Sequence, residues 1–195
     1  MMPAAAREYG VGRAHRVGRA KAPATPDRGH APGSPPGRPK DAGTLRVRPI
    51  ALRELLVIEV RVRPVVDLGG GRRYVPFEGG TFAGRDGLAG TILEGGIDWQ
   101  RVRPDGVLEI DAHYTLCTDR DETIEVRSRG LRKASDEVTE RLARGDPVDP
   151  DEYYFRTHVR LSTSSPRLGW LNDLLGVSTG SRDRSVVRID VHEVR

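Results

Sequence analysis

Three ionisable residues in the second half of the chain could carry acid–base chemistry. Asp98 stands directly before Trp99, Asp111 lies in a later segment of alternating polarity, and Arg156 lies in a second such segment. Two carboxylates in different surroundings can divide the roles of acid and base. A guanidinium can hold a carboxylate or an enolate through charge-assisted hydrogen bonds. These three side chains are therefore the candidate catalytic residues.

Aromatic residues and one amide could form the walls of a binding pocket beside them. A ring next to an amide suits the recognition of a small molecule, and Trp170 stands close to Asn172 in the segment PRLGWLNDLLG. The same segment could instead plug one end of a barrel, and Trp99 could simply pack a corner. The candidate ligand-binding residues are Phe82, Trp99, Tyr114, Tyr154, Trp170 and Asn172.

Other kinds of site find little support in the sequence. His113, His158 and His192 stand in separate segments without HxH, HExxH or CxxC spacing, so no metal site is predicted. Cys117 is the single cysteine, which excludes an internal disulfide. The glycine-rich run 79–96 does not lead from a strand into a helix, so it does not predict a phosphate cradle. We expect no cofactor.

The elements that must position these residues are short strands. From Leu52 onward, β-branched runs alternate with Gly, Pro and Asp, a pattern typical of a meander or barrel. One helix is predicted over Ser135–Arg144, because Ser135 can cap it and Val138 and Leu142 share one face. Strands are expected near Leu55–Val65, Arg73–Gly84, Gly87–Leu93, Val107–Thr118, Thr123–Gly130, Tyr153–Thr163, Leu174–Thr179 and Ser185–Val194.

Eight strands at hairpin spacing with one short helix indicate a mostly β protein built as a small antiparallel barrel. Two of the strands alternate clearly: Leu108 to Leu116 and Tyr153 to Leu161 each place apolar residues on one face and polar residues on the other. The polar faces could be solvated outer walls, or they could line a polar lumen.

Charge divides the chain into two regions. Residues 1–44 contain eight basic and three acidic residues, a net charge of +5, whereas the whole chain carries +4. The remainder is thus near −1, which makes nucleic acid an improbable partner for it. Because residues 1–44 are rich in Pro, Gly, Ala and Arg, we predict a disordered basic tail followed by one barrel domain over residues 45–195. No long apolar run indicates a membrane span or a signal peptide, so we expect a cytoplasmic protein.

A resemblance to a known family is carried by four segments: GGTFAGRDGLAGTILEGGIDWQRVRPDGVLEIDAHYTLCT, GDPVDPDEYYFRT, WLNDLLGV and VRIDVHEV. In this order the chain from about Leu52 to Arg195 resembles the bacterial and fungal family called domain of unknown function 3237, or uncharacterised protein family 0311. The resemblance implies a small β-barrel that often forms dimers, and it assigns no activity. Its motifs coincide with the candidate site residues above, together with Gly80.

Two hypotheses about function follow. In the first, the protein is a small-molecule-binding barrel and an enzyme of secondary or catabolic metabolism that needs no cofactor, such as an isomerase, cyclase or hydrolase. In the second, it is a non-catalytic, homodimeric interaction module without a small-molecule site. A lumen packed solid by Leu, Ile and Val would favour the second, and a cavity of roughly a few hundred Å³ lined by Asp98, Asp111 and Arg156 would favour the first.

Overall fold

A computed structural model describes residues 48–195 of the 195-residue chain. The predicted basic tail, residues 1–44, lies outside this described range. Within it, no helix combines the length and the apolar character that crossing a membrane requires.

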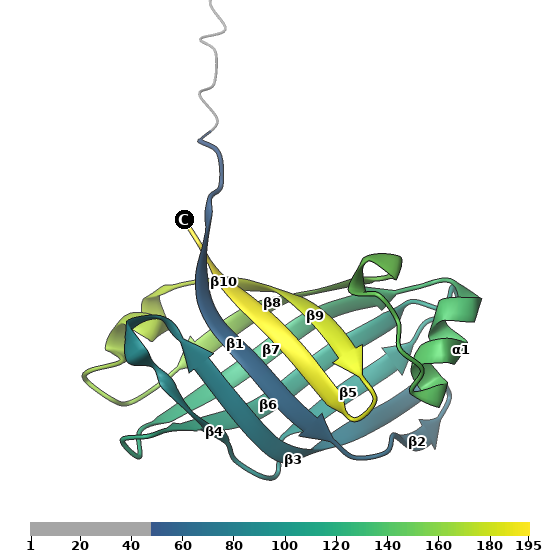
Figure 1. The fold of residues 1–195 in the computed structure, drawn as a ribbon, viewed down its shortest axis with the longest axis horizontal. Coiled ribbons are helices and arrows are strands. Elements are labelled where there is room, and N and C mark those ends of the chain that lie inside the picture. The colour runs from purple at the N-terminus through teal and green to yellow at the C-terminus, as the bar shows by residue number, and fades with distance from the viewer. Residues whose placement is uncertain (1–47) are drawn as a thin grey trace, which may run out of the picture. The chain divides into compact units, whose positions relative to one another are not determined.

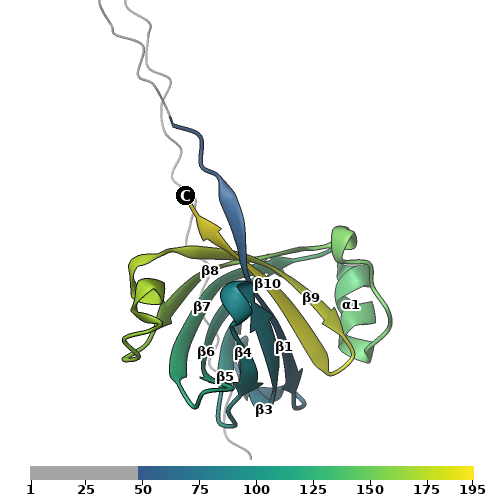
Figure 2. The same cartoon turned by 60° about the vertical axis from the view of Figure 1, so that its left-hand side comes forward.

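The described chain forms a closed antiparallel β-barrel with one α-helix, as the sequence predicts (Figures 1 and 2). Its elements in chain order are β1 (Leu52–Val62), β2 (Val66–Gly69), β3 (Arg72–Gly84), η1 (Arg85–Gly87), β4 (Ala89–Ile92), β5 (Ile97–Val102), β6 (Leu108–Thr118), β7 (Thr123–Lys133), α1 (Asp136–Arg144), η2 (Pro150–Glu152), β8 (Tyr154–Ser162), η3 (Gly169–Asp173), β9 (Gly176–Asp183) and β10 (Val186–Val194).

The ten strands fill eight positions around the barrel. β1 and β2 both pair with β3 and share one position, and β4 and β5 both lie between β3 and β6 and share another. The other strands follow in chain order from β6 to β10, and β10 pairs with β1 to close the ring. Closure leaves no long unpaired strand edge.

The prediction from sequence differs from the structure at two strands. β2 and β5 were not predicted, because each is short and stands beside glycines that also suit a turn: Gly69–Gly71 for β2 and Gly95–Gly96 for β5. Their pairing with β3 makes them strands. The omission of β5 matters because this strand carries Asp98 and Trp99.

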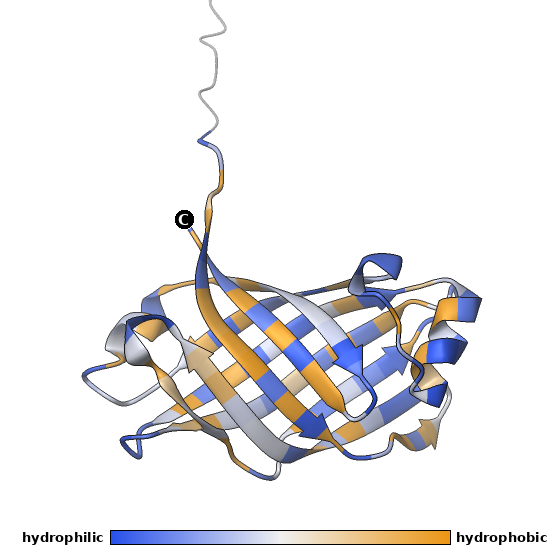
Figure 3. Ribbon diagram, viewed as in Figure 1, coloured by the Kyte–Doolittle hydropathy of each residue, from blue (hydrophilic) through white to orange (hydrophobic). Residues whose placement is uncertain are grey.

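Alternating hydropathy assigns the two faces of each strand (Figure 3). In β6 the residues from Leu108 to Leu116 with even numbers are buried, and Glu109, His113 and their neighbours face outward. β8 follows the same rule, with Phe155, Val159 and Leu161 buried. The polar faces of these two strands are therefore solvated outer walls, and the interpretation that they line a lumen is wrong.

The two ends of the barrel are covered differently. At one end, η3 brings Leu168, Leu171 and Leu174 into the core, with Leu171 fully buried. At the other end lies α1, on the right in Figure 1. As predicted, Ser135 caps this helix by accepting a hydrogen bond from the Val138 amide at 3.2 Å. Gly145 ends the helix in a left-handed conformation.

Candidate functional site

A cavity of about 50 Å³ lies inside the barrel, in the half nearer α1. Most of its wall is aliphatic or aromatic, from residues such as Val60, Phe77, Ile110 and Ile189. The polar side chains in the wall come from four strands and are few: Asp98, Gln100, Tyr114, Ser128, Arg132 and Arg182. An apolar cavity with a small number of converging polar groups is the usual form of a binding site.

Asp98 points into this cavity because of the register of β5. It pairs with Val75 on one side and Ala112 on the other, both of which are buried in the core. Gly96, just before β5, lies against Phe77 and Tyr114, where an added Cβ would come within 2.7 Å of Tyr114 Cβ. A residue with a side chain at position 96 would thus displace the wall around Asp98.

One oxygen of the Asp98 carboxylate accepts a hydrogen bond from a side chain. Gln100 Nε2 donates a hydrogen bond to Asp98 Oδ2 at 2.5 Å, and Arg73 Nε donates to Gln100 Oε1 at 2.9 Å. The other oxygen, Asp98 Oδ1, is inaccessible to solvent and has no hydrogen-bond partner among the described residues. Buried polar atoms without partners are rare in folded proteins, and they are expected at ligand and catalytic sites.

Burial raises the pKa of Asp98 to about 6, against the opposing effects of the Gln100 hydrogen bond and of the Arg132 charge. A carboxyl group with this pKa is largely ionised at pH 7 but can take up a proton easily. Such a value is suited to general acid or base chemistry near neutral pH.

Tyr114 contributes a phenol to the same cavity. Its ring packs on Phe77 with centroids 5.2 Å apart, and the residue is 5% exposed. Burial and the nearby negative charge of Asp98 raise the pKa of Tyr114, so its hydroxyl stays protonated. No described side chain hydrogen-bonds to this hydroxyl, which leaves it free to donate into the cavity.

Two arginines complete the polar wall, and a third stands behind it. Arg132 of β7 and Arg182 of β9 line the cavity, and Arg73 of β3 contacts it through Gln100. Burial, followed by the charges of Arg73 and Arg182, lowers the pKa of Arg132 to about 10. Burial also lowers the pKa of Arg73 and of Arg182.

A ladder of hydroxyl groups crosses the interior next to the cavity. Ser128 Oγ, Thr157 Oγ1 and Ser178 Oγ lie on three neighbouring strands and are joined by two hydrogen bonds of 2.7 Å each. Ser178 stands in GVSTG, which matches the G-x-S-x-G pattern of hydrolase nucleophiles. It lies inside β9 rather than at a strand-to-helix turn, and its hydroxyl is occupied by Thr157, so it does not form a nucleophile elbow.

The structure brings only two of the predicted site residues, Asp98 and Tyr114, to this cavity. Asp111 faces outward on β6, where it forms an ion pair with Arg129 at 2.9 Å. Arg156 lies outside the barrel on β8, with its guanidinium carbon 5.3 Å from the centre of the Tyr154 ring. Asp98 and Asp111 therefore stand on opposite faces of the sheet.

The remaining predicted ligand-binding residues lie elsewhere. Trp99 is 50% exposed on the outer face and packs against Tyr74, whereas Phe82 is buried in the core. Trp170 and Asn172 belong to η3, where Asn172 accepts from the Thr163 amide at 2.8 Å and donates to its carbonyl at 3.0 Å. These last two residues lie in the segment that covers the end of the barrel opposite the cavity.

Sequence reasoning did not single out Gln100, Ser128, Arg132 or Arg182. Each lies on the inward face of its strand, where alternation would predict an apolar residue. A polar residue at such a position is the signal that could have identified them. In β7, for example, Ser128 and Arg132 follow Ile124 and Val126 on the same face of the strand. For Gln100, the signal depended on recognising β5 as a strand.

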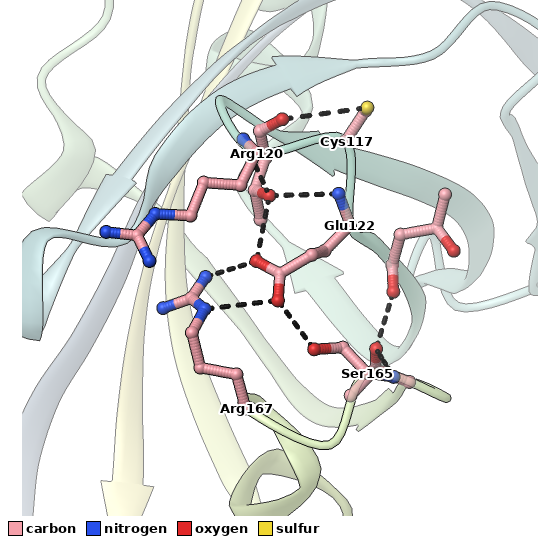
Figure 4. Close-up of polar contacts among 8 residues, drawn as sticks. Cys117, Arg120, Glu122, Ser165 and Arg167 are labelled. Carbon is pink, nitrogen blue, oxygen red and sulfur yellow. Dashed lines mark hydrogen bonds and ion pairs between the residues drawn. The ribbon is translucent and has the colours of Figure 1, made fainter.

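A second cluster of polar residues lies at the end that η3 covers (Figure 4). Glu122, after the β6–β7 turn, accepts hydrogen bonds from Arg167 and from Ser165 Oγ, the latter at 2.6 Å. These bonds, with Arg167 first, lower the pKa of Glu122 to about 2. Thr118, Ser165 and Arg167 all hydrogen-bond to Glu122, and these contacts tie the loop before η3 to the β6–β7 turn. We assign the cluster a structural role.

Among residues 48–195, no three His, Cys, Asp or Glu side chains gather as a metal site would require. The polar groups that line the cavity are one carboxyl group, one amide, one phenol, one hydroxyl and two guanidinium groups.

Comparison with known proteins gives the family of the chain. Residues 50–194 match the family described as protein of unknown function DUF3237. The chain belongs to this family. It is similar to UPF0311 protein RPA1785 of Rhodopseudomonas palustris, with 37% identity over 144 residues, which cover 72% of this chain and 94% of that protein.

Solved structures of family relatives share the barrel. The crystal structure of RPA1785, a conserved protein of unknown function, has a TM-score of 0.73 and covers 76% of this chain and 99% of its own, at 35% identity. A β-barrel-like protein of Acinetobacter baumannii has a TM-score of 0.66 at 37% identity, covering 78% of this chain and all of its own.

A more distant structure shows the same fold alone. It is described as an enzyme from Penicillium herquei, with a TM-score of 0.57 at 20% identity, and the match covers 77% of this chain and 98% of that one.

Proposed function

We propose that this barrel binds a small molecule in its lumen and transfers a proton on it without a cofactor. The observation that carries the proposal is Asp98 Oδ1, a buried carboxylate oxygen without a partner in the wall of a cavity. Leaving such an atom unpaired destabilises the fold by about 1–3 kcal/mol or more. That cost is understandable where the atom has a partner in the bound state.

The cavity supplies the two groups that a proton transfer requires. Above pH 6 the Asp98 carboxylate can accept a proton from a C–H or O–H group of the ligand. Tyr114, which stays protonated, can donate a hydrogen bond to the negative charge that develops on the ligand. Asp98 then returns the proton to a different atom of the ligand, and the net reaction is an isomerisation or a cyclisation.

The family context agrees with this proposal without deciding it. The fold is shared with a protein described as an enzyme, which makes the barrel a plausible scaffold for catalysis, but at 20% identity the resemblance is one of fold. The site residues themselves must carry the argument. Hydrolysis, the third reaction class that the sequence suggested, would require a bound water that Asp98 could activate.

The test is a thermal-shift screen of the full chain against phenols, lactones and aromatic acids. A compound at about 100 times its dissociation constant should stabilise the protein by roughly 2.7 kcal/mol, which is several degrees. We expect turnover of a bound compound to be lost in Asp98→Asn and reduced in Tyr114→Phe, and to be retained in Tyr154→Phe, on the outer wall. Turnover that survives both lumen substitutions would contradict the proposal. Mass spectrometry and NMR of the recovered compound then measure turnover.

A further inference from the structure

The interior of the barrel contains more positive charge than its acidic groups can balance. Arg73, Arg132 and Arg182 act on one another electrostatically, and Asp98 is the carboxylate that acts on Arg73 and Arg132 from within the cavity. Asp67 also acts on Arg73, but it is exposed and its effect is the smallest. Asp98 thus acts on two of the three guanidinium groups, and no carboxylate acts on that of Arg182.

None of these three arginines forms an ion pair within residues 48–195. Arg73 donates to the neutral amide oxygen of Gln100, and Arg182 donates to the Arg184 carbonyl oxygen at 2.9 Å. Arg132 has no hydrogen-bond partner among the described side chains, although it is half-buried and lines the cavity. Elsewhere in the barrel, arginines with a similar degree of exposure have carboxylate partners, as Arg141 has in Glu152 at 2.8 Å.

Unpaired charges of one sign in a partly desolvated space repel one another and destabilise the fold. Packing does not explain them, because an aliphatic residue at 132 or 182 would continue the inward face of its strand. A bound anion would relieve the repulsion, and guanidinium groups match the geometry of carboxylate and phosphate oxygens.

We propose that Arg132 and Arg182 form an oxyanion-binding site at the α1 end of the lumen, with Arg73 adding positive charge from behind Gln100, and that the ligand is an organic acid. Its carboxylate or phosphate group lies against the guanidinium groups of Arg132 and Arg182, in the cavity that Asp98 and Tyr114 also line. This inference rests on the proposed function in that both place the ligand in one cavity, and it adds the chemical class of that ligand.

The size of the cavity limits how much of the ligand enters it. A volume of about 50 Å³ corresponds to the space of roughly three to five water molecules. This space suits an acidic group with one or two adjoining atoms, whereas a larger ring system would have to extend out of the barrel. The reacting atom is therefore expected close to the acidic group and beside the Asp98 carboxyl group.

Isothermal titration of the full chain with inorganic phosphate and with benzoate tests the proposal. Both titrations are made at fixed ionic strength set with sodium chloride, so that general screening is constant. We expect at least one anion to bind, and the anion that binds identifies the acidic group. Arg132→Gln and Arg182→Gln should each weaken binding by about tenfold or more, as loss of a charge-assisted contact does. The control Arg160→Gln, on the outer face of β8, should bind as the wild type does.

Asp98→Asn separates this proposal from the proton-transfer function. At pH 8 this substitution removes a negative charge beside the arginines. The anion affinity should therefore rise, by about tenfold for the loss of one nearby charge. Anion binding that persists in Asp98→Asn while turnover is absent from the wild type would support the anion site and refute the catalytic role. Binding of neutral ligands alone, dependent on Asp98, would support the catalytic role and overturn the anion site.

A second substitution at position 132 distinguishes loss of the anion site from misfolding of the variant. Arg132→Lys retains the charge and loses the planar guanidinium, so anion affinity should fall between those of the wild type and Arg132→Gln. Circular dichroism shows whether each variant is folded. Wild-type affinity in a folded Arg132→Gln variant, or no binding of either anion to the wild type, would overturn the proposal.

Discussion

The two ends of the barrel use the same kinds of residue in opposite ways. At the η3 end, Arg167 donates a hydrogen bond to Glu122, and this bond raises the pKa of Arg167. At the α1 end, Arg132 has no carboxylate bound to it, and burial lowers its pKa to about 10. The shifts have opposite signs because one arginine has gained a partner and the other has lost water. Arg167 is thus part of a structural contact, whereas the guanidinium of Arg132 is free for the anion that we propose.

The apolar residues show the same contrast. Leu168, Leu171 and Leu174 fill the η3 end, whereas the wall near α1 leaves a cavity between Val62, Leu108 and their neighbours. The barrel is therefore packed solid in one half and hollow in the other. Neither hypothesis raised by the sequence describes this lumen in full, because the cavity is about 50 Å³ and, of Asp98, Asp111 and Arg156, only Asp98 lines it.

The largest change in stability is expected at the end of the barrel that η3 covers. Leu171→Ala should lower the free energy of unfolding by about 2–5 kcal/mol, because Leu171 is fully buried and its removal leaves a void. Urea unfolding measures this change. Leu175→Ala, four residues later and 54% exposed, is the control and should lie within about 0.5 kcal/mol of the wild type. Equal effects of the two would show that η3 does not plug the barrel.

At the end that contains the cavity, we expect a change of intermediate size in the free energy of unfolding, and in the stabilising direction. The pKa of Asp98 is raised to about 6 in the folded protein from an ordinary value of 3.8. The folded state therefore holds the proton more tightly, and stability falls as pH rises from about 4 through 6. Asp98→Asn, which cannot ionise, should gain about 2–3 kcal/mol relative to the wild type between pH 4 and pH 8.

This prediction is checked by urea unfolding of both proteins across that pH range. Asp111→Asn is the control, because Asp111 lies on the outer face in an ion pair with Arg129. A difference between wild type and Asp98→Asn that does not change with pH would mean that Asp98 is not held in a desolvated cavity.

The smallest effect is expected from the exposed ion pair at the η3 end. The pKa of Glu122 is lowered to about 2, so its contribution to stability is present above its ordinary pKa of 4.5 and disappears as pH falls through 2. Glu122→Gln should lower the melting temperature slightly at pH 7 and have no effect near pH 2. The difference at pH 7 should shrink in 1 M salt, as it does for exposed pairs. A salt-independent loss would instead assign the effect to the hydrogen bonds of Ser165.

Local sequence determined the fold to a large extent. Alternation placed Leu108 and Phe155 on the apolar faces of their strands, and Ser135 marked the start of α1, because these signals act within a few residues of the chain. The resemblance to the family also followed from the sequence, through its short motifs. Dimer formation, which that resemblance implies, stays a prediction.

Tertiary structure alone decided which polar residues share a site. Asp98 and Asp111 both stand in conspicuous motifs, yet strand pairing places them on opposite faces of the sheet. Arg132 and Arg182 are far from Asp98 in sequence and reach the same cavity only because the strands close into a ring. Sequence patterns report the face of a single strand. The position of one strand relative to another depends on long-range pairing, which such patterns do not contain.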